Sequence, residues 1–181
     1  NLAMQNGINI YNTDKRKLSR NEFENCIFSC EKPDFILSCC YDRIFSKSIL
    51  EFPKIAALNV HPSLLPSYRG IKPLENAIIN GDKTIGVTLH KLTTELDAGE
   101  IILQQGGINI TDTNTYDELY NQQGILISKI FDRFFKNPYY YLQNGKKQDE
   151  KKISFAPRTQ FEINITDTVK EIRLKAQKNV E

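Results

Sequence analysis

The sequence has 181 residues, 40% of them hydrophobic and 25% charged, which is typical of one globular domain with its own core. Its 24 basic and 22 acidic residues give a net charge of +2, which argues against a surface built to bind nucleic acid. No apolar run approaches the roughly 20 residues of a membrane-spanning helix, and the first residues do not resemble a signal peptide, so we expect a cytoplasmic protein.

Short apolar or β-branched runs alternate with segments of helical periodicity along the chain. Strands are predicted at 35–40, 56–61, 84–92 and 100–110. Helices are predicted at 18–31, 46–51, 73–80, 113–136 and 167–181, and Asn114 or Thr115 is the expected N-cap of the longest helix. The mainly apolar run 35–40 is typical of a strand buried on both faces. This order of elements predicts an α/β fold with an open, mostly parallel sheet and helices on both faces.

Four cysteines occur early in the chain, at Cys26, Cys30, Cys39 and Cys40. Neither the Cys-x-x-Cys pairs nor the nearby histidines of a zinc site accompany them. We therefore interpret them as reduced thiols in the core of a cytosolic protein, and we expect no metal.

The residue pair with the clearest chemical potential is Asn59 and His61, at the end of the predicted strand 56–61. Side chains two apart on a strand share a face, so both can point into one pocket at the carboxyl end of the sheet. An amide can donate to a developing oxyanion, and an imidazole can donate to it or carry a proton. The pair is therefore suited to acyl transfer.

A carboxylate that orients the imidazole is the expected third member of such a site. Asp97 is the candidate, because it lies in a glycine-containing loop between two predicted strands. Spacing alone leaves other interpretations open. A single histidine after a strand is often structural, and Asp-Ala-Gly is often only a turn.

Two longer motifs contain these residues. The stretch Asn59–Gly70 reads Asn-Val-His-Pro-Ser-Leu-Leu-Pro-Ser-Tyr-Arg-Gly, and it resembles the signature of the 10-formyltetrahydrofolate-dependent formyltransferases. Gly-Val-Thr-Leu-His at 86–90, followed by Leu-Asp-Ala-Gly-Glu-Ile-Ile at 96–102, resembles the second half of that signature at the customary interval. The resemblance covers about 33–135 and implies a Rossmann-like formyltransferase fold.

The resemblance implies a catalytic triplet of Asn59, His61 and Asp97, in a metal-free transfer of a formyl group from 10-formyltetrahydrofolate to an amine. The implied pterin site lies against the loop 41–45, under the turn at 65–66 and beside the loop 93–97. Its expected contact residues are Tyr41, Arg43, Ile44, Leu65, Pro66, Thr94 and Asp97. Ser63, Tyr68 and Arg69 are expected to face the amine acceptor, and His90 is interpreted as a structural residue beside the site.

The family also implies a division of the chain. Residues 1–136 correspond to the catalytic domain, without the strand–helix–strand unit with which the family begins. Residues 137–181 form a short C-terminal extension, with a dimerisation hairpin and a terminal helix as expected features. Phe155, Phe161, Ile163 and Ile165 are candidates for a homodimer contact, although core packing explains them equally well.

The acceptor amine is less well defined by the motifs. Tyr-Arg-Gly at 68–70 and Gly-Val-Thr at 86–88 resemble the transfer-RNA and amino-sugar branches more than the purine branch. The near-neutral charge and the short tail favour a nucleotide-linked amino sugar for polysaccharide synthesis. Alternatives are methionyl-tRNA or glycinamide ribonucleotide as acceptor, a folate-binding domain without turnover, and a hydrolase that releases formate.

Overall fold

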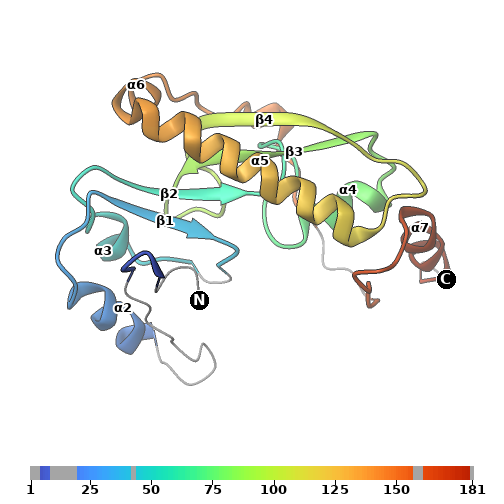
Figure 1. Cartoon of the computed structure of the whole chain (residues 1–181), viewed down its shortest axis with the longest axis horizontal. Helices are drawn as coiled ribbons and strands as arrows, with labels where there is room; N and C mark the ends of the chain where they lie inside the picture. Colours follow the sequence, from blue (N-terminus) through green and yellow to red (C-terminus); the bar gives the residue numbers. More distant parts are fainter. Residues whose placement is uncertain (1–4, 9–19, 42–43, 157–160, 180–181) are drawn as a thin grey trace.

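The computed structural model describes residues 5–8, 20–41, 44–156 and 161–179. Four strands form one open sheet in the order β1 (Phe35–Cys39), β2 (Ala56–His61), β3 (Thr84–Lys91) and β4 (Ile101–Asn109) (Figure 1). β1 and β2 pair in parallel, whereas β2–β3 and β3–β4 pair antiparallel. The α/β class and the open sheet are confirmed. The expectation of a mostly parallel sheet is wrong for the described strands, because the chain returns after β2 and β3 without a crossover.

The described helices agree with the periodicity of the sequence. They are α2 (Arg20–Phe28), α3 (Lys47–Leu50), α4 (Pro73–Ile79), α5 (Tyr116–Lys136) and α7 (Val169–Lys178). Thr115 caps α5 in a capping box with Glu118, which matches one of the two expected caps. Two short elements were not predicted, α6 (Pro138–Gln143) and the 3-10 helix η1 (Glu150–Lys152).

The long helix α5 lies along one face of the sheet (Figure 1). Ile130 and Phe134 are fully buried there against Leu58, Val87 and Leu89 of β2 and β3. Burial of each such side chain contributes roughly 1.5–3 kcal/mol, so this contact fixes the centre of the sheet. A second cluster joins the start of α5 to α4 and α7, through Leu119, Ile78 and Ile172 among others.

A loop, rather than a helix, covers part of the opposite face of β3 and β4. Leu64 of the loop between β2 and α4 rests on Gly86 and Gly106. A Cβ at Gly86 would lie 2.7 Å from the Leu64 Cδ2 atom and 2.4 Å from a backbone oxygen, so only glycine fits there. This close approach places the loop directly over the sheet.

Polar groups of the sheet hold the same loop in register. The Thr88 hydroxyl donates to the Ser63 carbonyl at 2.6 Å and accepts from the Leu65 N–H at 3.1 Å. Gln104 Nε2 donates to the Leu65 carbonyl at 2.7 Å. The chain that follows His61 is thereby fixed to β3 and β4.

The strand β1 differs from the prediction of a strand buried on both faces. Its Leu37 is 41% exposed, because among the described strands β1 has β2 as its single neighbour. All four cysteines are free, as expected, but they are exposed rather than packed in the core. Cys26 on α2 and Cys30 just after it lie away from the core clusters, and Cys39 and Cys40 lie at the end of β1, at the rim of the sheet.

The segment after α5 returns to the sheet. Lys146 pairs with Ile101 of β4, and Phe155 pairs with Arg69. No hairpin of named strands occurs in the described residues 137–156 and 161–179. Phe161 and Ile163 pack against the α4–α7 cluster, whereas Phe155 and Ile165 are exposed. In the described part of the chain, no helix is both long and apolar enough to cross a membrane.

Candidate active site

The predicted triplet comes together at the carboxyl end of β2. Asn59 and His61 share one face of the strand, and Asp97 reaches them from residues 92–100 between β3 and β4, the candidate catalytic loop. The Asp97 Oδ2 atom lies 3.6 Å from His61 Nδ1. His61 and the Asp97 side chain are both more than nine-tenths buried, so their electrostatic interaction is little screened by water.

The second histidine of the chain belongs to the same cluster. The antiparallel register places His90 directly opposite Asn59, and His90 Nε2 lies 3.1 Å from Asn59 Nδ2. It also lies 3.5 Å from Asp97 Oδ1. Both histidines of the sequence therefore flank one carboxylate. The interpretation of His90 as a structural residue beside the site missed its contacts with two members of the triplet.

The partners of the ring nitrogens fix where protons lie. The carbonyls of Tyr68 and Lys91 can only accept, so His61 Nε2–H donates to Tyr68 O and His90 Nδ1–H donates to Lys91 O, each at 2.8 Å. A neutral His90 then presents a lone pair at Nε2 to the Asn59 N–H. A neutral His61 presents an unprotonated Nδ1 on the side of Asp97.

Burial and charge act in opposite directions on these groups. Burial lowers the pKa of His61, and it outweighs the opposite influences of Asp97 and the Tyr68 carbonyl. For Asp97, burial raises the pKa. The contact with His90, the charge of His61 and the Gly70 N–H together outweigh it, so the pKa of Asp97 is lowered. The carboxylate is thus ionised at neutral pH beside an imidazole that protonates reluctantly.

The backbone holds Asp97 in an unusual conformation. Its φ is +50°, in the left-handed region that non-glycine residues seldom adopt. The Gly70 N–H donates to Asp97 Oδ2 at 2.8 Å, and Gln148 Nε2 donates to the Asp97 carbonyl at 2.7 Å. A Cβ at Gly99 would lie 1.8 Å from the Lys91 carbonyl oxygen, so the loop can return to β4 only through glycine.

The triplet opens onto a cavity of about 340 Å³. Its wall contains Asn59, His61 and Asp97, with Ile71 and Leu74 as apolar members and Gln123 from α5. A narrower cavity of about 60 Å³ adjoins it and shares Asn59, Asp97, Tyr41, Ile44 and Leu96. The narrower cavity is also lined by His90, Phe45 and Leu92, together with Ser38, Thr93 and Glu95. The two cavities provide adjoining spaces that meet at Asn59 and Asp97.

The predicted folate-contact residues other than Asp97 differ in how they lie relative to the two cavities. Tyr41 and Ile44 line both cavities, and Tyr41 stacks on Phe45 with ring centroids 4.6 Å apart. Thr94 is exposed outside the cavity walls, although its neighbour Thr93 lies in one. Leu65 is buried and Pro66 half-buried in the loop over the sheet, and Arg43 lies outside the described residues. The pterin contacts of all these residues remain predictions.

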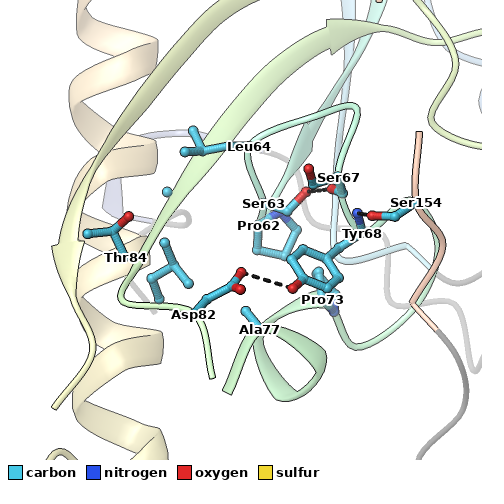
Figure 2. Close-up of a pocket in the computed structure, with 12 residues that line it drawn as sticks. Pro62, Ser63, Leu64, Ser67, Tyr68, Pro73, Ala77, Asp82, Thr84 and Ser154 are labelled. Atoms are coloured by element: carbon cyan, nitrogen blue, oxygen red, sulfur yellow. Dashed lines mark hydrogen bonds between the residues drawn. The ribbon is translucent and has the colours of Figure 1, made fainter. Parts of the chain in front are cut away.

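The predicted acceptor residues do not face the triplet. Ser63 and Tyr68 line a separate cavity of about 260 Å³ (Figure 2). In it the Ser63 hydroxyl donates to the Ser67 carbonyl at 2.6 Å, and the Tyr68 hydroxyl donates to Asp82 at 2.9 Å. Arg69 is buried, and its Nε and Nη2 atoms donate to Gln148 Oε1 at 3.1 and 2.7 Å. The role of these three residues with an acceptor remains a prediction.

Sequence reasoning missed Gln123, a wall residue of the larger cavity, and also Gln148. Gln148 lies in the stretch 145–152, which reads as a solvated polar loop, and a single glutamine there carries no pattern. Its partners are visible only once the strands and loops are placed. Among the described residues, no group of three or more His, Cys, Asp and Glu side chains is arranged to hold a metal ion.

Comparison with known families agrees with this geometry. A model of the family described as formyl transferase matches residues 4–131. Methionyl-tRNA formyltransferase of Mycoplasmopsis pulmonis is 34% identical over 157 residues, which cover 87% of this chain and 52% of that protein. The chain spans about half, or somewhat less, of the length of such curated relatives.

Solved structures with the same fold include sugar formyltransferases. The formyltransferase PseJ from Anoxybacillus kamchatkensis is 26% identical, with a TM-score of 0.56 over 81% of this chain and 70% of that one. That structure contains UDP-4,6-dideoxy-4-formamido-L-AltNAc and tetrahydrofolate. A sugar N-formyltransferase from a Shewanella species, 18% identical, gives a TM-score of 0.64 over 97% of this chain and 69% of that chain.

Proposed function

The chain belongs to the formyl transferase family, and from that premise we propose that it transfers a formyl group from 10-formyltetrahydrofolate to the primary amine of a nucleotide-linked amino sugar. One observation carries the proposal: Asn59, His61 and Asp97 meet at the wall of a single cavity of about 340 Å³. The co-substrate supplies the formyl group, and the residues of this chain orient it and move charge and protons around it.

Asn59 is the proposed donor to the formyl oxygen, which gains negative charge as the amine attacks. Its amide nitrogen carries two N–H groups, and one of them donates to His90 Nε2 at 3.1 Å. The other remains for the oxygen. A buried, preorganised donor of this kind accelerates acyl transfer by roughly 10²- to 10³-fold.

His61 and Asp97 are the proposed proton-handling pair. The attacking amine must lose a proton, and Nδ1 of neutral His61 is unprotonated. That atom lies 3.6 Å from the Asp97 carboxylate, too far for a hydrogen bond but close enough to stabilise an imidazolium. The lowered pKa of His61 keeps the ring neutral before transfer, and Asp97 favours its charge during transfer.

The narrower cavity is the proposed site of the folate ring. Tyr41, Phe45 and Leu96 give it apolar and aromatic walls, and it reaches Asn59 and Asp97. A flat heterocycle needs such walls, with polar groups at one edge. Tetrahydrofolate in the structure of the PseJ relative is further support.

Gln123 supports an amine in the larger cavity. Its Nε2 donates to the carbonyls of Pro62 and Gly86, at 2.8 and 3.3 Å, which fixes the direction of the amide. The buried Oε1 atom finds no partner among the described residues. A hydrogen-bond acceptor left unpaired in a buried position favours a ligand that brings N–H or O–H donors.

Two acceptors have specific support. The nucleotide-linked amino sugar is supported by the PseJ complex and by the near-neutral charge of the chain. Methionyl-tRNA is the second candidate, supported by the 34% identity to the Mycoplasmopsis pulmonis enzyme. A transfer-RNA enzyme makes many phosphate contacts, and its activity should therefore fall steeply with salt.

The test is formyl transfer from 10-formyltetrahydrofolate to a panel of nucleotide-linked 3- and 4-amino sugars, glycinamide ribonucleotide and methionyl-tRNA. The panel should be run with the wild type, Asn59→Ala and His61→Ala, and with free formate measured in parallel. Turnover on one amino sugar that is lost in both variants is expected. Turnover on methionyl-tRNA alone would make methionyl-tRNA the acceptor in place of the amino sugar. Formate release without transfer, or folate binding without turnover, would refute transfer.

A further inference from the structure

Gln148 connects three segments that lie far apart in the sequence. Its Oε1 atom accepts from Arg69 Nε and Nη2 at 3.1 and 2.7 Å. Its Nε2 atom donates to the carbonyls of Asp97 and Gly99 at 2.7 and 2.8 Å. The two acceptor sites and two donors of a carboxamide are therefore all used.

Position 148 carries a carboxamide where a carboxylate would be the usual partner of Arg69. Arg69 is 7% exposed, and no carboxylate among the described residues forms an ion pair with it. A glutamate at position 148 would be the usual partner for a buried guanidinium. A carboxylate, however, has no N–H for the two carbonyls of the candidate catalytic loop. Only an amide can hold Arg69 and the loop at the same time.

The contacts form a closed path around Asp97. Gln148 holds the main-chain oxygen of Asp97, and Gly70, the residue after Arg69, donates to the Asp97 side chain at 2.8 Å. Arg69 itself is fixed from both sides, because its N–H donates to Ser154 O and its carbonyl accepts from Ala156 N, each at 2.9 Å. The segment 146–156 thus supports both ends of the catalytic aspartate.

We propose that Gln148 is a positioning residue of the active site: by joining Arg69 to the carbonyls of Asp97 and Gly99, it holds the Asp97 carboxylate between His61 and His90. The residue does not touch the reacting groups and acts through Asp97. This role rests on the proposed function for its kinetic consequence, but its structural consequence does not depend on turnover.

The experiment compares Gln148→Glu and Gln148→Ala with Lys147→Ala, an exposed neighbour without a site contact. Gln148→Glu keeps the size and the Arg69 contact, removes the two N–H donors and adds one negative charge, which faces the Arg69 guanidinium. Both Gln148 variants should lower kcat by about 10- to 100-fold, the usual consequence of a small displacement of a catalytic group, while KM changes by less than about threefold. Lys147→Ala should match the wild type.

A second readout uses the two histidines of the chain, which give two imidazole signals in an NMR titration. Burial lowers the pKa of His61, Asp97 raises it, and His90 lowers it further. Displacement of Asp97 should therefore move the His61 midpoint to lower pH in both Gln148 variants and leave it unchanged in Lys147→Ala.

Gln148→Glu with normal kcat and a normal His61 midpoint would overturn the proposal. So would a loss confined to thermal stability, with kcat and the midpoint unchanged well below Tm. If the wild type transfers no formyl group to any acceptor, the proposed function fails, and the titration still decides the role of Gln148. If Gln148→Ala does not fold, the comparison of Gln148→Glu with Lys147→Ala decides that role alone.

Discussion

The loop between β2 and α4 contributes to two cavities whose polar groups are used in opposite ways. In the first, His61 Nδ1 lies 3.6 Å from the Asp97 carboxylate. His90 Nε2 contacts both the Asn59 amide and that carboxylate. In the second, the Tyr68 hydroxyl donates to Asp82 at 2.9 Å (Figure 2) and accepts from Asn80 at 3.1 Å. His61 and Ser63 are two residues apart, yet they line different cavities.

The difference shows what distinguishes the candidate active site from a polar pocket. The Ser63 and Tyr68 hydroxyls of the second cavity are satisfied by hydrogen bonds to the Ser67 carbonyl and to the Asp82 and Asn80 side chains. The groups of the first cavity are partners of one another, and two of them have shifted pKa values. A clustered set of perturbed titratable groups is the favoured place for proton chemistry.

The largest contrast is expected between the carboxylates of the two cavities. Asp97→Asn removes the charge that supports a His61 imidazolium, and kcat should fall by about 10²- to 10⁴-fold. Asp82→Asn keeps a partner for Tyr68 and should leave kcat within about threefold of the wild type. Steady-state formyl transfer measures both. Equal losses in the two variants would remove the distinction between the cavities.

A smaller effect is expected at His90. His90→Phe keeps a ring of similar size but removes the acceptor that orients the Asn59 amide, so kcat should fall by about 10- to 100-fold. Thermal unfolding serves as the control for folding. If His90→Phe is stable and fully active, then Asn59 is oriented without its neighbour, and His90 is a packing residue after all.

Tyr68→Phe tests whether the second cavity contributes to stability alone. It removes the hydrogen bonds of one hydroxyl, which typically contribute about 1 kcal/mol to the free energy of unfolding. The Asp82 and Asn80 side chains can turn to water, so kcat should stay within about twofold. Urea unfolding and steady-state kinetics measure the two quantities. A large rise in KM for the acceptor would instead assign the second cavity to substrate binding.

The pH dependence of stability should be the mildest signature. The folded-state pKa values of His61 and Asp97 both lie below their ordinary values. The unfolded chain therefore binds protons first, and stability falls as the pH decreases. The His61 contribution is lost from about pH 6.5 downward and that of Asp97 from about pH 4 downward. His61→Gln should flatten the upper part of a plot of Tm against pH, and an unchanged slope there would refute a depressed His61 pKa.

Much of the secondary structure could be predicted, because periodicity is a local property. The strands at 35–39, 56–61, 84–91 and 101–109 and the helix at 116–136 lie within a few residues of their expected bounds. Strand direction is not local. The alternation of helices and strands favours a parallel sheet, but the connections after β2 and β3 return the chain antiparallel, although the first of them contains α4.

The residues of the candidate site also differ in whether local sequence is enough to find them. Asn59 and His61 could be paired by their spacing on one strand, and Asp97 was assigned through the motif. His90 could not be placed opposite Asn59 without the antiparallel register of β2 and β3. Gln148 could not be found at all, because a single glutamine in a polar run acquires meaning only from partners 79 and 51 residues away.

That separation has a consequence for the synthesis of the protein on the ribosome. A nascent chain that has emerged through β4 already carries Asn59, His61 and Asp97, but it lacks the groups that hold the candidate catalytic loop. Gln148 follows Asp97 by 51 residues, which at translation rates of roughly 5–20 residues per second delays its arrival by on the order of several seconds. The loop is therefore expected to be unsupported during synthesis and to become competent only when the segment 146–156 closes behind it.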